Sequence, residues 1–215
     1  MACVPGGPAW LGSSAANRQE RKALLPKYWH ARVDSEREWA LVELDSFWID
    51  KTPVTNLHFA EFRPTHLDRY PDEEDHHPVV CVSWHDALAY ANWLGKKLVC
   101  EERWEKAARG SRGNLYPWGD EYEPSRLNAY ESGPRGTSQV QAHPAGASPY
   151  GCLDMAGNIW EWTASRWSEG GPFMVQKGGS TLNPAPLQQC STRMEAFPDF
   201  VLQWVGFRLM SEEGV

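Results

Sequence analysis

The tract from residue 154 to residue 161 gathers oxygen atoms that can bind a cation. Asp154 and Glu161 supply two carboxylates, and Gly157 lies in a tight turn between them whose backbone carbonyls can point inward. Oxygen ligands of this kind suit a hard cation. A hydrogen-bonded turn without metal explains the same residues. The tract therefore predicts either a cation site or a structural turn.

Sulfur chemistry is a second possibility, because the chain has five cysteines. Their number is odd, they are scattered, and no two of them form a CxxC pair. A disulfide or zinc framework needs paired spacing. We therefore expect buried or inert thiols at these positions, which are Cys3, Cys81, Cys100, Cys152 and Cys190.

Other polar residues have simpler interpretations. His76 and His77 are adjacent, and adjacent strand side chains point to opposite faces, so the two rarely share one metal ion. Ser180 has no histidine motif nearby and is expected to be a strand hydroxyl rather than a nucleophile. The acidic stretch from Asp72 to Asp75 is expected to be a solvated loop.

Caps and apolar spacing indicate three helices. Thr55 can cap a helix that begins directly after it. Ser83, with Asp86 three residues later, resembles a capping box, and the helix that follows would end at Gly95. The stretch 101–109 has acidic residues first and basic residues last, as the helix dipole favours.

Short strands and turns account for the rest of the chain. Residues 13–38 are polar and charged, and we expect a long irregular excursion there. Leu41–Asp50 alternates enough to be one strand. The pattern predicts an α+β fold with small antiparallel sheets. After Gly110, turn signals separate further short strands, expected at Ile159–Thr163, Phe173–Lys177 and Val205–Met210.

Length and charge limit the function classes. The chain has 215 residues, which fits a single domain over 1–215, and a net charge of −7. An acidic balance disfavours broad binding to nucleic acid or anionic membranes. No apolar run approaches the roughly 20 residues of a membrane span, and no secretory signal is visible at the N-terminus. We therefore expect a cytoplasmic globular protein without nucleic-acid or membrane partners.

In order and spacing, eight tracts resemble the formylglycine-generating enzyme, or sulfatase-modifying factor, superfamily. The resemblance covers nearly the whole chain. It implies a C-type-lectin-like fold with little regular secondary structure, in agreement with the α+β prediction. The tracts are Phe47–Asn56, His77–Trp84, Gly95–Leu98, Trp104–Gly110, Tyr116–Gly119, Gly151–Trp162, Lys177–Ser180 and Gly206–Leu209.

The active enzymes that the chain resembles oxidise a substrate cysteine to formylglycine with dioxygen, and two of their cysteine thiolates hold copper(I). Counted forward from Ser180, the two positions fall on Asn183 and Gln188. Counted back from Gly206, the second position is deleted and Cys190 matches a later, non-catalytic position. Neither count yields a thiolate pair. The resemblance therefore implies no copper site and no formylglycine-generating activity.

The same resemblance implies structural calcium. The ligands would be the side chains of Asp154 and Glu161 with the carbonyls of Gly157 and Ile159. A second site would use Asn128 and the Ala129 carbonyl, completed from the loop 131–138, which departs from the family pattern.

Without the cysteines, the fold is a scaffold with a variable loop surface. The leading interpretation is a catalytically silent module that recognises a protein or peptide through residues 181–204. Within this range, 197–204 is too apolar for an ordinary exposed loop. Retroelement-diversified variable proteins place their variation in the corresponding region, so membership of that group is a sub-hypothesis. The residues expected to contact the ligand are Asn183, Gln188, Glu195, Phe197, Phe200 and Trp204.

The alternative is an oxidase or other tailoring enzyme of the same superfamily that works without the cysteine pair, similar to a pyoverdine-maturing oxidase. Glu195 and Asp199 lie in the right tract to act as acid or base. The thiohistidine-type sulfoxide synthases need a further helical domain, for which this chain has no room. A polar pocket beside Ser180 and Asn183 would favour the enzyme, whereas a filled surface would favour the binding module.

Overall fold

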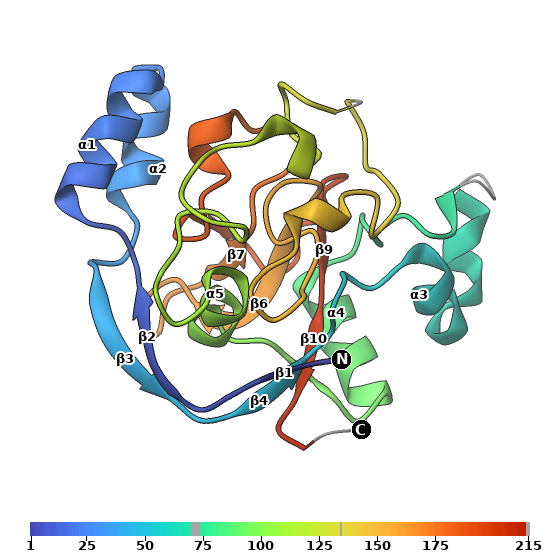
Figure 1. Cartoon of the computed structure of the whole chain (residues 1–215). Coiled ribbons are helices and arrows are strands. Elements are labelled where there is room, and N and C mark those ends of the chain that lie inside the picture. Colours follow the sequence, from blue (N-terminus) through green and yellow to red (C-terminus); the bar gives the residue numbers. More distant parts are fainter. Residues whose placement is uncertain (70–73, 134, 214–215) are drawn as a thin grey trace.

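The computed structural model describes residues 1–69, 74–133 and 135–213 (Figure 1). Asp72 and Glu73 of the acidic stretch lie outside the described residues. The helices are α1 (Ala15–Leu24), α2 (His30–Asp34), α3 (Asn56–Phe62), α4 (Trp84–Trp93) and α5 (Glu101–Arg109), with the 3-10 turns η1 (Lys27–Trp29), η2 (Pro64–Arg69), η4 (Pro124–Arg126), η5 (Pro144–Gly146) and η6 (Ala185–Leu187). The strands are β1 (Ala2–Val4), β2 (Gly7–Leu11), β3 (Ala40–Leu44), β4 (Phe47–Ile49), β5 (Lys97–Leu98), β6 (Trp160–Arg166), β7 (Met174–Lys177), β8 (Arg193–Ala196), β9 (Val205–Phe207) and β10 (Leu209–Ser211).

The first sheet joins the two ends of the chain. Its strand order is β1-β4-β10-β5, and each neighbouring pair is antiparallel. Ile49 on β4 pairs with Ala2 on one side and Met210 on the other, so β1 and β10 flank the same strand (Figure 1).

The second large sheet has the order β8-β7-β6-β9. Its pairs are antiparallel except β6 and β9, which run parallel with Glu161 opposite Gly206. The predicted α+β organisation is confirmed, with this one parallel pair as the departure. The tract 177–192 follows directly from β7 and returns to the sheet as β8, so this sheet positions the expected site.

The strand predicted over 41–50 is in fact two strands in different sheets. β3 pairs with β2, whereas β4 joins the first large sheet. Along β3 most side chains are exposed, and on β4 both Phe47 and Ile49 are buried. Asp45 and Ser46 are two consecutive polar residues that interrupt the alternation, so the boundary between the two strands falls where the pattern changes phase.

Residues 13–38 are not an irregular excursion but mainly a helical hairpin, α1 and α2 joined by η1 (Figure 1). Ser14 caps α1, its side chain accepting the Asn17 N–H at 3.2 Å. Within α1 the buried residue is an arginine, Arg21. Because the buried position within α1 is charged, the buried face of this helix is not marked in the sequence by a stripe of apolar residues.

The predicted caps are confirmed. The Thr55 hydroxyl accepts the His58 N–H at 3.2 Å at the start of α3. At α4, Ser83 Oγ accepts the Asp86 N–H at 3.1 Å and Asp86 Oδ2 accepts the Ser83 N–H at 3.0 Å, which makes a complete capping box.

Helix α5 lies between the two large sheets. Its predicted apolar face, made by Trp104, Ala107 and Ala108, packs in one cluster with Phe47 and Ile49 of the first sheet. The Trp104 indole N–H also donates to Glu161 on β6 at 2.7 Å. One helix therefore connects the sheet at the termini to the sheet that carries the expected site.

Candidate functional site

The segment that follows β7 is shaped by two glycines. Gly178 and Gly179 have backbone φ values of +102° and +74°, which residues other than glycine rarely adopt. A Cβ on Gly179 would meet Gln188 Oε1 at 2.2 Å. The chain therefore turns sharply and brings Gln188 against its own beginning.

Buried amides fill the place where the sequence resemblance puts the catalytic thiolates. Asn183 Oδ1 accepts hydrogen bonds from Trp160 Nε1 at 2.9 Å, Ser180 Oγ at 2.8 Å and Ser180 N–H at 3.0 Å. Gln188 Nε2 donates to the carbonyls of Ser180 and Asn183, each at 2.8 Å. These side chains are part of the interior rather than the wall of a cavity.

Burial bears on the predicted ligand-binding role of two residues. Asn183 is 6% exposed and Gln188 is 0% exposed. A macromolecular ligand contacts side chains at the surface, so neither residue is placed to touch it directly. Their amides instead fix the shape of the loop, because each bond joins residues of the tract to one another or to β6.

The helical hairpin supports the same segment from outside. Arg21 of α1 donates from Nε to the Pro186 carbonyl and from Nη2 to Thr192 Oγ1, both at 2.7 Å, and pairs with buried Glu36. Leu187 packs with Leu25 and Val33 in a small apolar cluster. The sequence analysis missed this support. The available signal was Ser14 before a run of good helix formers, with Arg21 and Lys22 in its last turn.

Cys190 lies deep in the core. It packs in the cluster of α5, and its N–H donates to the Leu115 carbonyl at 2.8 Å. Burial raises the pKa of its thiol to about 12. All five cysteines are free thiols. Cys190 is therefore protonated at neutral pH and unsuited to act as a soft metal ligand.

An aromatic surface, defined by Phe173, Phe197, Phe200 and Val201, covers one edge of the second large sheet. The rings of Phe173 and Phe197 lie 4.4 Å apart, and those of Phe197 and Phe200 lie 5.4 Å apart. Phe197, Phe200 and Val201 are 41%, 49% and 54% exposed. The predicted apolar loop thus presents a contiguous group of rings to solvent.

The backbone beneath the aromatic surface is held in place. The Pro198 carbonyl accepts the Trp84 N–H at 2.9 Å, and the Leu202 carbonyl accepts the Cys81 N–H at 3.0 Å. Trp204 is only half-buried and packs on the core below. Of the aromatic residues predicted to bind a ligand, Phe197 and Phe200 face outward, whereas Trp204 mainly anchors the loop.

The two carboxylates considered as acid or base, Glu195 and Asp199, lie apart from each other and have different partners. Glu195 forms an ion pair with Arg32 of α2 and lines a cavity of about 150 Å³ with Tyr28 and Trp29. Asp199 is exposed and lies 3.4 Å from His85. Within the described residues, neither carboxylate forms a hydrogen bond or ion pair with Ser180 or Asn183.

Glu161, the expected calcium ligand, is the counter-ion of Arg208. Both carboxylate oxygens accept from the guanidinium at 2.7 Å, and Oε2 also accepts from Trp104 at 2.7 Å. Although burial opposes the charged form, Glu161 raises the pKa of Arg208. A calcium ion would have to share this carboxylate with a fully buried cation. The donor set at Glu161 does not fit the ion as arranged.

The other expected calcium ligands are also engaged. Asp154 Oδ2 accepts the Gln141 N–H at 3.2 Å, and burial raises the pKa of Asp154. The Ala129 carbonyl accepts two backbone N–H groups, and Asn128 Nδ2 donates to the Gly136 carbonyl at 2.9 Å. Both calcium sites stay untested, and the existing partners of their ligands argue against them.

The backbone of the turn is shaped by close packing. The buried Ile159 backbone continues from the turn at Gly157, whose N–H donates to the Gly178 carbonyl at 2.8 Å. A Cβ on Gly157 would meet the Asn128 carbonyl oxygen at 2.4 Å, so the two expected sites share one tightly packed turn.

Within the described residues, no three His, Cys, Asp or Glu side chains gather closely enough to hold a metal ion. His77 Nδ1 lies 2.8 Å from Thr137 Oγ1, which fits the structural interpretation of this histidine.

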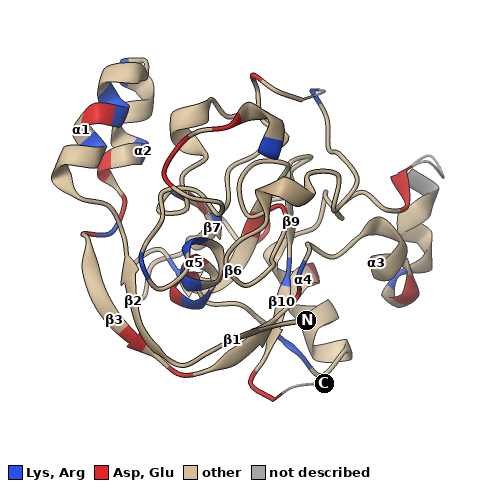
Figure 2. Cartoon of the chain, in the orientation of Figure 1, with Lys and Arg blue, Asp and Glu red and all other residues tan. Residues whose placement is uncertain are grey.

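A buried ionic cluster joins α5 to β7 and β8, and Figure 2 shows acidic and basic residues side by side on α5. Glu105 accepts from Lys177 at 2.9 Å and from Arg109 at 2.7 Å, while Glu101 pairs with Arg193 at 2.9 Å. Burial by itself would raise the pKa of Glu105. The nearby cations of Lys177 and Arg109 outweigh this effect and hold its pKa below the ordinary value. The cluster fixes the strand that leads into the candidate site.

Comparison with known sequences decides the family. The profile of the sulfatase-modifying factor enzyme 1-like domain matches residues 1–213. The chain belongs to this family. Within the family it is 41% identical over 154 residues to inactive C-alpha-formylglycine-generating enzyme 2 of Bos taurus, covering 64% of this chain and 51% of that protein.

Relatives named for enzymes are also found. The chain is 32% identical over 182 residues to the formylglycine-generating enzyme of Mus musculus, covering 67% of this chain and 48% of that one. It is 31% identical over 205 residues to hercynine oxygenase of Mycolicibacterium smegmatis, covering 75% and 44%. The chain spans about half the length of these relatives.

Solved structures confirm the fold of the family. Treponema denticola variable protein 1 superimposes with a TM-score of 0.80 at 18% identity, covering 99% of this chain and 95% of that chain. PvdO from Pseudomonas aeruginosa gives a TM-score of 0.78 at 23% identity, covering 98% and 93%. The expected C-type-lectin-like fold of the formylglycine-generating-enzyme type is confirmed.

No helix among the described residues has the length and apolar character of a membrane span.

Proposed function

We propose that this protein is a catalytically silent member of its family that binds a protein or peptide partner through the aromatic surface. The observation that carries the first half is the buried amide network at Asn183 and Gln188. It occupies the positions at which the resembling enzymes need thiolates.

The chemistry of the donor set supports this proposal. Copper(I) prefers soft thiolate and thioether ligands, and an amide oxygen is neither. Cys190 lies in the core, with a thiol pKa raised by burial to about 12. The residues present therefore do not fit the copper site of the active enzymes. Among the relatives, the 41% identity is to a protein named as inactive.

The second half rests on the chemistry of the aromatic surface. Rings on a backbone fixed by hydrogen bonds lose little conformational entropy when a partner covers them. Aromatic side chains are also enriched among the residues that carry most of the binding energy in protein interfaces. A partner that packs an apolar side chain against the exposed faces of Phe197 and Phe200 suits this surface.

Catalytic silence is tested with the purified chain, copper(I) and a cysteine-containing peptide under air. We expect no aldehyde on the peptide and no stoichiometric tight copper(I) complex. Cys190→Ser should leave any weak copper binding unchanged. Aldehyde formation, or a one-to-one complex lost in Cys190→Ser, would contradict this half of the proposal.

Partner binding is tested by a pull-down from the native host with three versions of the chain. The double variant Phe197→Ala, Phe200→Ala removes the aromatic surface. The control Leu24→Ala, Leu41→Ala removes two exposed apolar side chains outside this surface, one on α1 and one on β3. A partner should be captured by the wild type and the control and lost with the Phe double variant. Equal capture by all three would disprove the role of this surface.

Sequence variation among sister proteins provides a further test, for membership of the retroelement-diversified proteins. Within 181–204, Leu187, Gln188 and Thr192 are fully buried. Diversification compatible with folding should therefore concentrate at exposed positions such as Phe197 and Phe200. Divergence spread evenly along the chain would remove this sub-hypothesis.

The second candidate function is an oxidase or other tailoring enzyme. The cavity beside Glu195, together with a relative named hercynine oxygenase, favours it. Oxygen consumption with candidate substrates tests this candidate, and Glu195→Gln should abolish the activity if Glu195 is the acid or base. Unchanged turnover in that variant would exclude the role of Glu195.

A further inference from the structure

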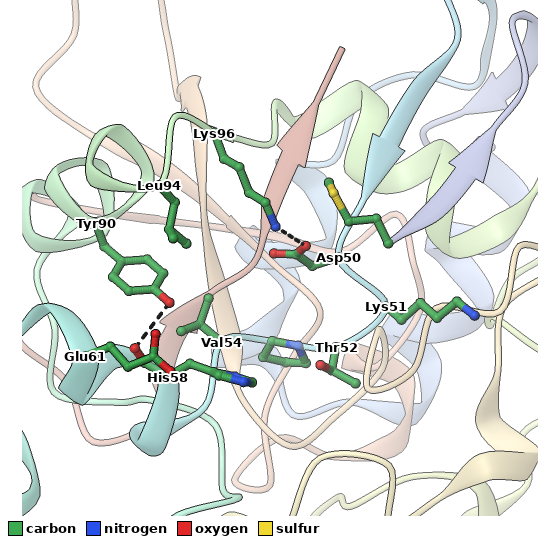
Figure 3. Close-up of a pocket in the computed structure, with 11 residues that line it drawn as sticks. Asp50, Lys51, Thr52, Val54, His58, Glu61, Tyr90, Leu94 and Lys96 are labelled. Atoms are coloured by element: carbon green, nitrogen blue, oxygen red, sulfur yellow. Dashed lines mark hydrogen bonds and ion pairs between the residues drawn. The ribbon is translucent and has the colours of Figure 1, made fainter. Parts of the chain in front are cut away.

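A cavity of about 350 Å³ lies on a different part of the molecule, between the exit of β4 and the helices α3 and α4 (Figure 3). His58 and Glu61 come from one side of α3, and Tyr90 and Leu94 come from the last turns of α4. This cavity is separate from the tract 181–204, which contributes no residue to its lining.

Some of the charged side chains around the cavity have an ion-pair partner and others do not. Lys96 is bonded to Asp50 at 2.9 Å, so these two groups neutralise each other. Lys51 extends away from Tyr90 and Glu61 (Figure 3). Among the described residues, no hydrogen-bond donor or cation is paired with the Glu61 carboxylate. Glu61 is solvent-exposed, so one negative charge at the open side of the cavity, whose lining also includes Met1, has no partner within the protein.

Tyr90 adds a hydrogen-bond acceptor beside that charge. Its hydroxyl donates to the His58 carbonyl at 3.3 Å, which leaves the oxygen lone pairs free to accept. Burial, with Glu61 and Asp50 contributing, raises the pKa of Tyr90 to about 12. The hydroxyl thus remains protonated and lies in a negative field.

Two further features favour a cation with an apolar stem. Helix α4 points its C-terminal end at the cavity, because Leu94 is its C-cap, and a helix C-terminus carries roughly half a negative charge. Val54 and Leu94 supply apolar wall on the same side (Figure 3). A short alkyl chain can lie against them while its charged end reaches Glu61.

The geometry points to this cavity as a binding site for a primary alkylammonium group, held by the Glu61 carboxylate and the Tyr90 hydroxyl oxygen, with the alkyl chain against Val54 and Leu94. A lysine side chain of a partner and a free polyamine share this chemistry.

The test uses the full ¹⁵N-labelled chain and a titration with n-butylammonium, followed by the backbone amide signals of Thr52, Val54, Leu94 and Lys96. We expect saturable shifts at these residues. Neutral n-butanol should not produce them. Equal shifts with both compounds, or none with n-butylammonium, would overturn the proposal.

Variants separate the ammonium site from general surface charge. Because Glu61 is exposed, Glu61→Gln should weaken the affinity about threefold or more, as expected for an ion pair in contact with water. Tyr90→Phe should weaken it less while keeping the ring packing. The matched control Glu20→Gln removes an exposed carboxylate on α1 and should change nothing. Unaltered affinity in Glu61→Gln, with a normal melting curve, would disprove the site.

Two larger probes distinguish the sources of the ammonium group. Nα-acetyl-lysine methylamide presents the amine on a peptide side chain, and spermidine presents it on a free polyamine. Tighter binding of the lysine derivative assigns the cavity to a partner protein, and tighter binding of spermidine assigns it to a polyamine. Failure of both to displace n-butylammonium would contradict the proposal.

Discussion

At the residue scale, the decisive feature is the exchange of thiolate positions for amides. Asn183 and Gln188 use their side chains to hold Ser180 and Trp160, so polar groups that would otherwise be buried without partners are satisfied. The two positions that the resemblance matches to the metal ligands of the active enzymes are part of the interior here. The same atoms cannot both complete this network and bind copper(I).

Asn183→Ala tests the structural role of that network. The change leaves the Trp160 indole N–H and the Ser180 hydroxyl buried without their acceptor, so we expect a loss of about 2–3 kcal/mol in the free energy of unfolding. The neighbouring control Leu182→Ala, at an exposed side chain, should cost about 0.5 kcal/mol or less. Urea denaturation measures both. Equal losses in the two variants would show that the amide network adds no stability.

Glu105 determines a part of the pH dependence of stability. Its pKa in the folded protein is lowered, since Lys177 and Arg109 outweigh the opposing effect of burial. Its contribution is therefore complete above the ordinary glutamate pKa of about 4.3 and is lost as the pH falls through the lowered folded value. We expect the urea midpoint to fall between pH 5 and pH 3, as estimated from this range of pKa values.

In the variant Glu105→Gln the urea midpoint should fall less between pH 5 and pH 3 than in the wild type. In the control Glu20→Gln it should fall as much as in the wild type. An identical acid profile in Glu105→Gln would assign the fall to other carboxylates.

At the element scale, the helical hairpin of α1 and α2 is the feature that most changes the candidate site. It is attached to the tract 185–192 by Arg21 and by the packing of Leu187 on Leu25 and Val33. The tract itself contains only the short turn η6, so its order depends on the hairpin. A change in α1 is therefore transmitted to the loop that leads into β8 and the aromatic surface.

Arg21→Met tests this dependence. It leaves Glu36 buried without its cation, so we expect a loss of about 3–5 kcal/mol in unfolding free energy. Hydrogen exchange should quicken at residues 186–192 more than in β6. The double variant Arg21→Met, Glu36→Leu should recover much of the stability, because it leaves no uncompensated charge. Unchanged exchange at 186–192 would show that the hairpin does not order the tract.

At the scale of the whole molecule, the two proposed sites lie at opposite ends of one helix. The N-terminus of α4 is bonded to the backbone under the aromatic surface, and its C-terminus faces the cavity at Glu61. A ten-residue helix is about 15 Å long. A partner that covers the rings and extends a lysine along α4 could occupy both sites, which makes the two tests complementary.

Removal of divalent metal tests a property of the whole fold. Since Arg208 already neutralises Glu161 and the Ala129 carbonyl already accepts two N–H groups, we expect neither a chelator nor added calcium to shift the melting temperature. Differential scanning calorimetry checks this expectation. A fall in melting temperature with chelator that calcium reverses would instead support the calcium sites implied by the resemblance.

The features that could be predicted from sequence are those encoded within a few neighbouring residues. The caps at Thr55 and Ser83, the helix over 101–109 and the motifs of the family were all confirmed. The absence of a thiolate pair near Ser180 also follows from sequence, because it depends only on residue identities. Helix α1 was missed because its buried contact is made by Arg21, which pattern analysis counts as a surface residue.

The sequence by itself determined the family, the fold class and the residue types in the tract after Ser180. The tertiary structure alone decided that Asn183 and Gln188 are buried, that Phe197 and Phe200 are exposed, and that Glu161 belongs to Arg208. The reason is physical: burial and pairing join residues far apart in the chain, 47 positions in the case of Glu161 and Arg208 and 165 in the case of Arg21 and Pro186. A local sequence pattern does not show which distant residue pairs with a given charge or packs over a given ring.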